Sequence, residues 1–278
     1  MIALLANPDS GSGEAGEVER LLERLGHDVA RFKLGQVAEV AAAGPERIVV
    51  AGGDGSLGCA AEAASRAGVP LGVVPVGTAN DFARALELPE ELEQAVELAA
   101  DGDHTECLDL GRAGQRPFVN AASAGLSPIA ARKAHGLKRA LGPLAYTVGA
   151  LRAGLFANPV EARVEVDGRT AFDGRAWQVI VGVTGAFGGG ADVDADPADG
   201  RLDLVAIEAR SRARLVAHGY GLRAGRVEDQ EGVVSATGNR IAVRTDRDSG
   251  FNVDGELVEE PGLEFTVEPR AYEAVTGR

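Results

Sequence analysis

The sequence predicts an α/β domain followed by a β-rich domain. In the first hundred residues, short apolar runs alternate with amphipathic stretches of helical period, whereas beyond Pro159 the chain consists mostly of strand-like runs separated by turn residues. A length of 278 residues also exceeds what one hydrophobic core usually serves, which favours two domains. The alternation in the first part is typical of a layered α/β domain with a mostly parallel sheet.

The first part is expected to contain four strands, each followed by helical sequence. Its first helix is indicated by apolar residues that recur at i, i+3, i+4 and i+7 from Val18 to Leu25, and Gly26 ends it. The strands are short apolar runs, of the kind that parallel sheets bury on both faces. The expected strands are Ile2–Ala6, Asp28–Phe32, Ile48–Ala51 and Leu71–Pro75, and the expected helices are Glu14–Leu25, Gln36–Ala43, Leu57–Ala67, one from about Asn80, and Glu90–Ala100.

The sequence beyond Asp101 is richer in strands, with Asp167-Gly168 as a hairpin signal. The expected strands are Glu106–Arg112, Pro117–Ala122, Val160–Val166, Ala176–Val183, Leu202–Glu208, Arg240–Arg244, Phe251–Val253 and Leu263–Val267, and two helical stretches are expected within Ser127–Ala157. Their spacing indicates a β-sandwich. We place the first domain at residues 1–105 and the second at 106–267, with 268–278 as a candidate to pack back on the first.

Composition excludes several classes of protein. With 45% hydrophobic and 25% charged residues the chain is an ordinary globular protein. The 42 acidic and 28 basic residues give a net charge of −14, which argues against a nucleic-acid partner. Cys59 and Cys107 form neither a disulfide framework nor a zinc motif, which suits a reducing cytosol. No apolar run approaches the roughly 18 residues of a membrane span, so any membrane contact is expected to be peripheral.

The most informative motif is the Gly-Gly-Asp-Gly-Ser turn at Gly52–Ser56, which follows one expected strand and precedes a helix. Glycines let a ligand approach the main chain, and consecutive N–H groups in such a turn form an anion-binding concavity at which the helix dipole also points. The turn therefore indicates a phosphate site. A plain strand-to-helix loop stays open as the alternative for this turn taken by itself.

A second polar turn, Gly77–Arg84, follows the next expected strand. Helix capping by Thr78 or Asn80 is the simpler explanation of each residue alone, and Asp81 complements the helix dipole. Because both turns follow strands of one parallel sheet, they are expected at the same edge, where α/β proteins bind ligands.

A third glycine-rich segment, Gly11–Gly16, satisfies G-x-G-x-x-G. In a dinucleotide-binding turn the first glycine lies almost at the strand end, whereas here Asn7–Ser10 intervene, and Lys33 stands where an acidic residue is expected. We therefore do not assign an NAD site to it.

Together, Gly52–Ser56 and Gly77–Arg84 resemble the two hallmark motifs of the diacylglycerol kinase catalytic domain family, which contains bacterial lipid kinases and the sphingosine and ceramide kinases. The second motif is the more specific, because the glycine-aspartate turn is shared with NAD kinases. The resemblance continues in order along nearly the whole chain, through Asn7-Pro8, Asp109, Asn120–Leu126, Gly188–Gly190, Asp199–Asp203 and Asp254–Glu256.

This resemblance implies an ATP-dependent kinase in which nucleotide and acceptor meet between an α/β domain and a β-sandwich domain, as in the NAD-kinase and diacylglycerol-kinase folds. The first domain would bind the nucleotide and the second the lipid. The chain contains no Gly-Lys-Ser/Thr, so main-chain amides would hold the phosphates. The implied nucleotide-binding residues are Asn7, Ser10, Gly11, Gly52, Gly53, Asp54, Gly55, Ser56, Thr78 and Asn80.

The resemblance also gives roles to carboxylates of the second domain. Glu256 matches the general base that takes the proton of the acceptor hydroxyl, although a hairpin turn with a solvated glutamate is the simpler explanation of Asp254-Gly255-Glu256 alone. Asp199 matches a magnesium site, with main-chain oxygens of Asp196 and Arg201 as further ligands. The remaining assignments are Asp54 as a catalytic residue that organises metal and phosphate, and Asp81, Asp109 and Asp254 as a supporting acidic network.

The implied reaction transfers the γ-phosphoryl group of ATP to a lipid hydroxyl, with Mg²⁺ as cofactor and a diacylglycerol-type acceptor favoured. We expect the basic segment 132–139 to meet anionic lipid headgroups, and the alternative for it is a solvated basic helix face. The protein would then be cytoplasmic and peripheral at the inner membrane face, and a homodimer stays open. Other readings are a NAD-kinase-like or small-alcohol kinase and, in a different class, a non-catalytic nucleotide-binding or lipid-sensing homologue.

Overall fold

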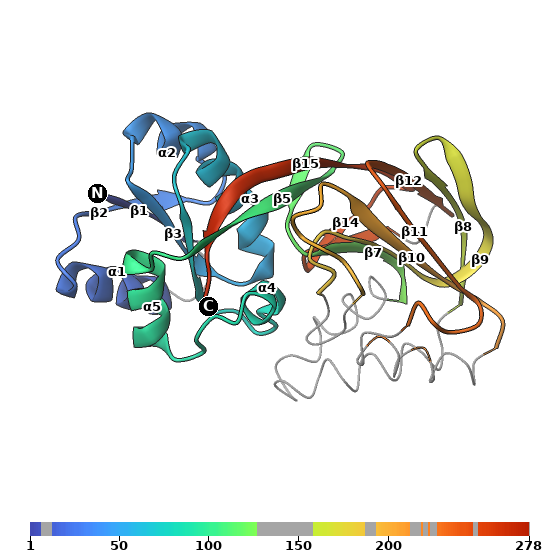
Figure 1. The fold of residues 1–278 in the computed structure, drawn as a ribbon, viewed down its shortest axis with the longest axis horizontal. Coiled ribbons are helices and arrows are strands. Elements are labelled where there is room, and N and C mark those ends of the chain that lie inside the picture. Colours follow the sequence, from blue (N-terminus) through green and yellow to red (C-terminus); the bar gives the residue numbers. More distant parts are fainter. Residues whose placement is uncertain are drawn as a thin grey trace.

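The computed structural model describes residues 1–6, 13–126, 158–186, 193–211, 218, 222, 227–246 and 250–277. It shows an α/β lobe and a β lobe, which two long strands connect (Figure 1). The predicted fold class, an N-terminal α/β domain with parallel strands and a C-terminal β-sandwich-like domain, is confirmed.

The α/β lobe is built on a parallel sheet in the order β4-β3-β1-β2. The strands are β1 (Ile2–Ala6), β2 (Val29–Lys33), β3 (Arg47–Gly52) and β4 (Leu71–Pro75). The helices are α1 (Glu14–Arg24), α2 (Val37–Ala43), α3 (Asp54–Ala67), α4 (Asp81–Ala85) and α5 (Leu92–Asp101).

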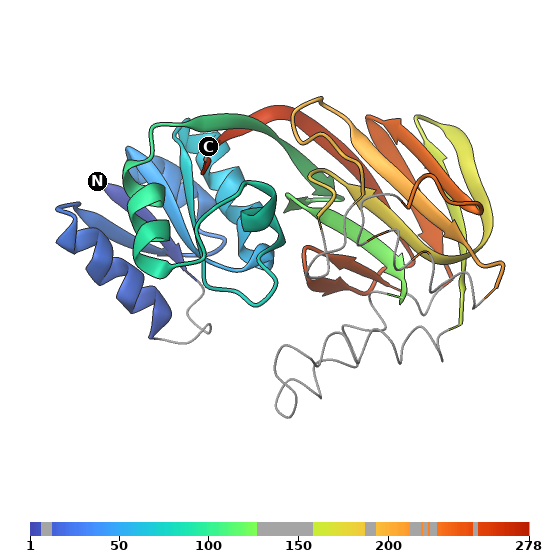
Figure 2. The ribbon, with the colours of Figure 1, turned by 60° about the horizontal axis from the view of Figure 1, so that its bottom comes forward.

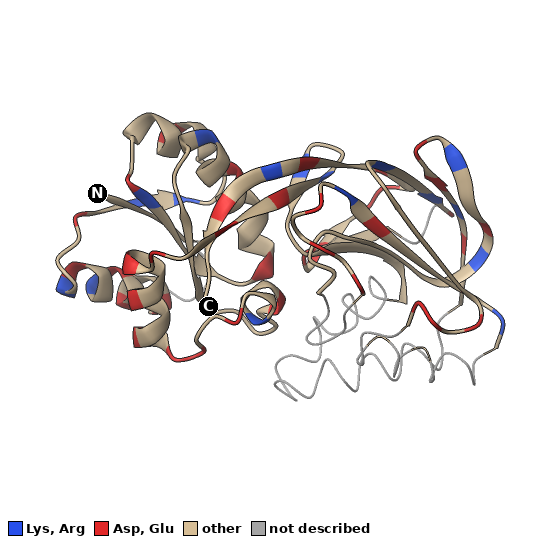
Figure 3. Ribbon diagram, in the orientation of Figure 1, with Lys and Arg blue, Asp and Glu red and all other residues tan. Residues whose placement is uncertain are grey.

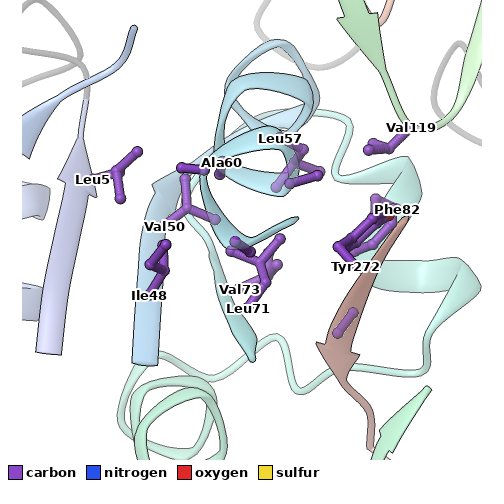
Figure 4. Packing of buried hydrophobic residues seen from close by; sticks show 14 of the residues in the cluster. Leu5, Ile48, Val50, Leu57, Ala60, Leu71, Val73, Phe82, Val119 and Tyr272 are labelled. Atoms are coloured by element: carbon purple, nitrogen blue, oxygen red, sulfur yellow. The ribbon is translucent and has the colours of Figure 1, made fainter. Parts of the chain in front are cut away.

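Helices cover both faces of this sheet, as its apolar strands require. Successive side chains of a strand point to opposite faces. In β1, Leu4 therefore joins a core with residues of α1 and α5, whereas Leu5 joins one with residues of α2 and α3. Figure 4 shows the second of these cores, which also receives Val119 from the β lobe, next to Phe82 of α4. The two lobes thus share buried apolar contacts.

Antiparallel strands form the β lobe (Figure 2). They bury a separate apolar core. Three phenylalanines meet edge to face in it: the ring centroids of Phe118 and Phe265 are 6.1 Å apart, and those of Phe251 and Phe265 are 5.9 Å apart. The strands are β5 (Thr105–Ala113), β6 (Arg116–Phe118), β7 (Ala121–Gly125), β8 (Val160–Val166), β9 (Arg169–Gly182), β10 (Leu202–Glu208), β11 (Val233–Gly238), β12 (Arg240–Thr245), β13 (Phe251–Val253), β14 (Glu256–Val258) and β15 (Gly262–Val275).

β15 belongs to both lobes. Its first residues pair with β12, most of its length pairs antiparallel with β5, and Ala274 pairs in parallel with Leu71 of β4. Figure 1 shows β15 and β5 running together from one lobe to the other. The pairing with β5 shifts register between Glu268 and Tyr272, where Arg270 has a left-handed φ of 49°. The strand expected at Leu263–Val267 therefore continues to Val275 and becomes an edge neighbour of the parallel sheet.

Several elements differ from the sequence-based expectations. The helix expected from Leu57 begins at Asp54, and the strand expected at Pro117–Ala122 is split into β6 and β7. β11 was not expected, because its sequence is partly polar and its residues are only half buried. The helical stretches expected within Ser127–Ala157 lie outside the described residues. Within the described ranges, every helix is too short or too polar to cross a bilayer.

Candidate functional site between the two domains

Both polar turns lie at one edge of the parallel sheet. β3 and β4 pair in parallel with Gly52 opposite Pro75, so the segments that follow them leave the sheet side by side. A Cβ on Gly77 would lie 2.5 Å from Gly53 Cα, and the Val76 N–H donates to Gly52 O at 3.2 Å. The two turns therefore touch through their main chains, at a distance that only glycine permits.

The Gly52–Ser56 turn leads directly from β3 into α3, with no loop between them. Gly53 is the N-cap, no side chain caps the helix, and Asp54, Gly55 and Ser56 lie in its first turn. Main-chain N–H groups in the first turn of a helix have no intrahelical partner, and together with the helix dipole they attract anions. The earlier start of the helix thus places the glycine-aspartate turn where a phosphate is most readily bound.

Asn80 is held in a left-handed conformation with a φ of 50° and does not cap α4. Its side-chain amide instead donates to Pro75 O at 3.3 Å and to Gly77 O at 3.2 Å. Its Oδ1 is buried and has no hydrogen-bond partner among the described residues. Thr78 is exposed, whereas Asp81 is buried and pairs with Arg84. Helix capping, the simpler explanation of Asn80, is not what the structure shows.

Asp54 connects three elements through one carboxylate oxygen. Its Oδ1 accepts the main-chain N–H of Phe82, in α4, at 3.1 Å and the side-chain amide of Asn120, between β6 and β7, at 3.0 Å. Asn120 belongs to the β lobe and is 1% exposed. The carboxylate at the start of α3 is thereby fixed relative to both the second polar turn and the β lobe.

Asp254 is the buried carboxylate on the β-lobe side. It lies with Gly255 in a two-residue turn between β13 and β14, and both residues have positive φ, 45° and 90°. Its side chain accepts three consecutive main-chain N–H groups, those of Val119 at 2.7 Å and of Asn120 and Ala121 at 3.0 Å. The pKa of Asp254 is raised to about 7, chiefly by burial; the charge of Asp54 acts in the same direction and the three N–H donors in the opposite one.

Glu256 follows this turn as the first residue of β14 and faces the start of α3. A Cβ on Gly55 would lie 3.4 Å from Glu256 Cγ and 3.6 Å from its Oε1. Glu256 is half-exposed, and its Oε2 accepts a hydrogen bond from Arg116 Nη1 at 2.7 Å. Residues that are two hundred positions apart in the sequence thus meet where the two lobes touch.

Asp109 lies in β5, one of the two connecting strands, and is completely buried. It accepts the main-chain N–H groups of Gly200 and Arg270, both at 2.6 Å, while its own N–H donates to Pro197 O at 2.8 Å. It therefore fastens the 196–201 loop to β15. Burial raises the pKa of Tyr272, and the charges of Asp254 and Asp109 act in the same direction.

The residues expected to hold magnesium lie in that loop. Asp196 accepts the Ala198 N–H at 3.0 Å, and Asp199 accepts the Arg201 N–H at 2.8 Å. The pKa of Asp203 is raised to about 6, chiefly by burial; the charges of Asp199, Asp194 and Asp196 act in the same direction and that of Arg201 in the opposite one. This excess of negative charge and the oxygen donors suit Mg²⁺, although no three acidic, histidine or cysteine side chains of the described residues form a ready metal cluster.

The structure brings together the expected residues Gly52–Ser56, Asn80, Asp254 and Glu256, and it places Asp109 with the 196–201 loop. The expected residues Asn7, Ser10 and Gly11, the basic segment 132–139 and Gly188–Gly190 lie outside the described residues. Three residues that were not assigned to the site contact it: Asn120, Thr184, which donates to Asn120, and Arg116. The sequence signal for Asn120 was its place in a family motif, whereas Thr184 and Arg116 had none.

Comparison with protein families divides the chain in two. The diacylglycerol kinase catalytic domain matches residues 1–113, and the YegS C-terminal NAD kinase beta sandwich-like domain matches residues 120–276.

Individual proteins that are similar to this chain in sequence or structure are named diacylglycerol kinases. A diacylglycerol kinase of Staphylococcus epidermidis (strain ATCC 35984) is 32% identical over 248 residues, which cover 84% of this chain and 78% of the relative. A diacylglycerol kinase of Staphylococcus aureus (strain JH9) is 29% identical over 271 residues, covering 91% and 85%. In structure, the chain resembles a diacylglycerol kinase from Bacillus anthracis str. Sterne, with a TM-score of 0.76, 19% identity and coverage of 99% and 96%, which supports the fold.

Proposed function

The chain belongs to the diacylglycerol kinase family, and on that premise we propose that it transfers the γ-phosphoryl group of ATP to a lipid hydroxyl, with a diacylglycerol-type alcohol as acceptor. One observation carries the proposal. The Glu256 carboxylate of the β lobe lies beside Gly55, in the first turn of α3, so a base and an anion-binding helix start adjoin one another.

In this proposal the nucleotide phosphates bind at the start of α3 and along the second polar turn. The N–H groups of the first turn and the helix dipole attract the anion, while Thr78 and the main chain around Gly77 line the other side. Asn7, Ser10 and Gly11 are proposed to complete the nucleotide site. Because the sequence contains no Gly-Lys-Ser/Thr motif, the phosphates are proposed to be bound mainly by main-chain amides.

Glu256 is proposed as the general base that accepts the proton of the lipid hydroxyl as it attacks the phosphoryl group. Its half-exposed position leaves it accessible to an acceptor, and Arg116 holds its other oxygen. Among the residues that the structure describes, Asp54 is held through Oδ1, which suits a residue that orients metal or water at the phosphates. Asp81, Asp109 and Asp254 support this arrangement from buried positions.

Magnesium is the proposed cofactor, because oxygen donors of Asp196, Asp199 and Arg201 suit a hard cation. Mg²⁺ bound with the nucleotide would neutralise negative charge on the transferring phosphoryl group. The residues of the chain would contribute by holding the phosphoryl donor and the acceptor in line, because this positioning provides much of the rate acceleration in phosphoryl transfer.

The test is phosphorylation of diacylglycerol in mixed micelles by the purified chain with labelled ATP. We expect a phosphorylated lipid from the wild type, and Glu256→Gln to lower kcat by roughly 10²- to 10⁴-fold while ATP binding is retained. Glu259→Gln, an exposed glutamate just after β14, is the matched control and is expected to keep wild-type activity. Asp54→Ala is expected to weaken nucleotide use.

The outcomes separate the alternatives. Phosphorylation of NAD or a small alcohol, with no lipid product, would favour the NAD-kinase-like function. Binding of ATP without turnover on any acceptor would favour a non-catalytic homologue. A Glu256→Gln variant with full turnover would remove Glu256 as the base, and offering a lipid extract in place of diacylglycerol would identify a different acceptor.

We also propose that the protein is cytoplasmic and reaches its acceptor at the inner membrane face through the basic segment 132–139. Support comes from the charge contrast in the chain, because exposed acidic residues gather on and around α5 of the α/β lobe (Figure 3). Replacing Arg132, Lys133, Lys138 and Arg139 by glutamine is expected to reduce pelleting with anionic vesicles. Neutralising two exposed arginines of the β8–β9 hairpin, Arg169 and Arg175, is the control. Equal pelleting of both variants would refute the proposal.

A further inference from the structure

A chain of three hydrogen-bonded side chains leads from the β lobe to the start of α3. The Thr184 hydroxyl donates to Asn120 Oδ1 at 2.9 Å, and Asn120 Nδ2 donates to Asp54 Oδ1 at 3.0 Å. Thr184 is 8% exposed and Asn120 is 1% exposed, whereas Asp54 is half-buried, so water has little access to the hydrogen bond between Thr184 and Asn120. In a buried setting each of these bonds is costly to lose, because its partners would be left unsatisfied.

Thr184 determines which end of the Asn120 amide faces Asp54. The Ala186 N–H donates to Thr184 Oγ1 at 3.4 Å, so the threonine hydrogen is directed at Asn120. Asn120 must accept that hydrogen with its carbonyl oxygen, which leaves its NH₂ group for the carboxylate. Without the hydroxyl, the amide loses the group that selects this orientation.

The main chain around Asn120 is fixed from both sides. Asp254 accepts the N–H groups of Val119, Asn120 and Ala121. On the other side, Val183 N donates to Asn120 O at 2.8 Å and Thr184 N donates to Val119 O at 3.3 Å. The amide therefore sits on a rigid base between two carboxylates, Asp54 and Asp254, where a neutral donor is needed rather than a third negative charge.

We propose that Thr184 and Asn120 are positioning residues for Asp54: the threonine orients the asparagine amide, and the amide fixes the carboxylate at the phosphate site. The inference rests on the proposed kinase function for the role of Asp54. It assigns to Thr184, which carries no motif and does not contact Asp54 directly, a function in catalysis that acts only through Asn120.

The test compares Thr184→Val, Thr184→Ser, Asn120→Ala and the double variant Thr184→Val/Asn120→Ala in the full chain. Two quantities are measured: kcat for lipid phosphorylation, and the calorimetric affinity for a non-hydrolysable ATP analogue with Mg²⁺. We expect Thr184→Val to lower kcat and the affinity by about 10-fold and Asn120→Ala by about 10- to 100-fold, the usual loss for residues that orient a ligand group. Thr184→Ser, which keeps the hydroxyl, is expected to restore most of both.

The double variant tests whether Thr184 acts through Asn120. If it does, the double variant should lose no more kcat or nucleotide affinity than Asn120→Ala alone. Thr276→Val is the matched control, a buried threonine beside His104 outside the site, and is expected to match the wild type. Should Thr184→Val fail to fold, Asn120→Asp still tests the role of the amide, because it puts a carboxylate against Asp54 and is expected to lose activity and binding; wild-type values would overturn the proposal.

Three results would overturn the proposal: wild-type values for Thr184→Val, an equal loss in Thr184→Ser, or a further loss when Thr184→Val is added to Asn120→Ala. Failure of the proposed function is a separate result. A wild type that binds the nucleotide analogue but phosphorylates no lipid refutes the lipid kinase, while the affinities of the variants still decide whether Thr184 and Asn120 position Asp54.

Discussion

Gly58 offers a test of how closely the two lobes must fit. It lies in α3, and a Cβ at this position would be 2.3 Å from Pro117 O and 2.8 Å from Pro117 C, in β6. The Gly58→Ala variant must open that contact from 2.3 Å to the 3.4 Å of ordinary van der Waals packing. The partner is main chain and cannot rotate away, so α3 and β6 have to separate by about 1 Å.

Two effects of opposite sign act on stability. Alanine favours a helix over glycine by about 1 kcal/mol, whereas overpacking costs about 1–3 kcal/mol. We therefore expect Gly58→Ala to lower the free energy of unfolding by up to about 2 kcal/mol. Activity should fall more sharply, because α3 carries Asp54 and β6 carries Arg116, and a misplacement of about 1 Å costs up to about 10²-fold in rate.

The assay is urea unfolding together with kcat for lipid phosphorylation. Gly16→Ala is the control for stability, since a Cβ there meets no atom within 4 Å, and it is expected to stabilise α1 by up to about 1 kcal/mol. If Gly58→Ala stabilises the protein as Gly16→Ala does and keeps wild-type kcat, the contact with Pro117 does not set the distance between the lobes.

Three further predictions concern charges at the site. Arg116→Gln should lower kcat by no more than about fivefold, since a half-exposed ion pair contributes at most about 1 kcal/mol. Added to Glu256→Gln, it should have no further effect. If it lowers kcat of the Glu256→Gln variant as much as that of the wild type, Arg116 acts directly on phosphate. Burial raises the pKa of the Cys59 thiol, and the charge of Glu256 acts in the same direction. In a Cys107→Ser background, Glu256→Gln should therefore let iodoacetamide alkylate Cys59 at lower pH. An unchanged pH dependence of alkylation would mean that Glu256 is too far from Cys59 to affect it. Because the pKa of Asp254 is raised in the folded state, from 3.8 to about 7, this residue binds more protons folded than unfolded, and its contribution to stability is lost as pH rises between these values. Asp254→Asn should be less stable but should lack that loss, which unfolding in urea at about pH 5.5 and about pH 8 would measure; equal slopes in both proteins would contradict it.

Where sequence pattern and tertiary structure agree, the elements were predictable. Leu71–Pro75, Val160–Val166 and Leu202–Glu208 have the bounds expected from their apolar pattern, because turn residues flank each of them. The start of α3 was missed for the opposite reason. Gly52, Gly53 and Gly55 are poor helix formers, and what holds the first turn in place includes bonds from Phe82 and Asn120 to Asp54, which lie elsewhere in the chain.

The candidate site was predictable as a set of motifs but not as a geometry. The approach of Glu256 to Gly55 was expected from the family resemblance, since nothing in the local sequence of either residue points to the other. Thr184 could not be found from sequence at all, because its significance lies in one hydrogen bond to Asn120. The roles of these residues stay predictions until the variants are measured.

The sharing of β15 between the lobes bears on how the protein comes to be folded during synthesis. Tyr272 and Ala274 lie in the core of the α/β lobe, although the ribosome adds them after nearly all of the β lobe. The parallel sheet therefore gains β15, the strand next to β4, only after residues 262–275 have emerged from the ribosome. The first hundred residues must wait, with part of their apolar surface uncovered, through the synthesis of the entire β lobe. A fragment ending near residue 113 should consequently be prone to aggregation, and we expect that the α/β lobe cannot be exchanged between proteins as a module on its own.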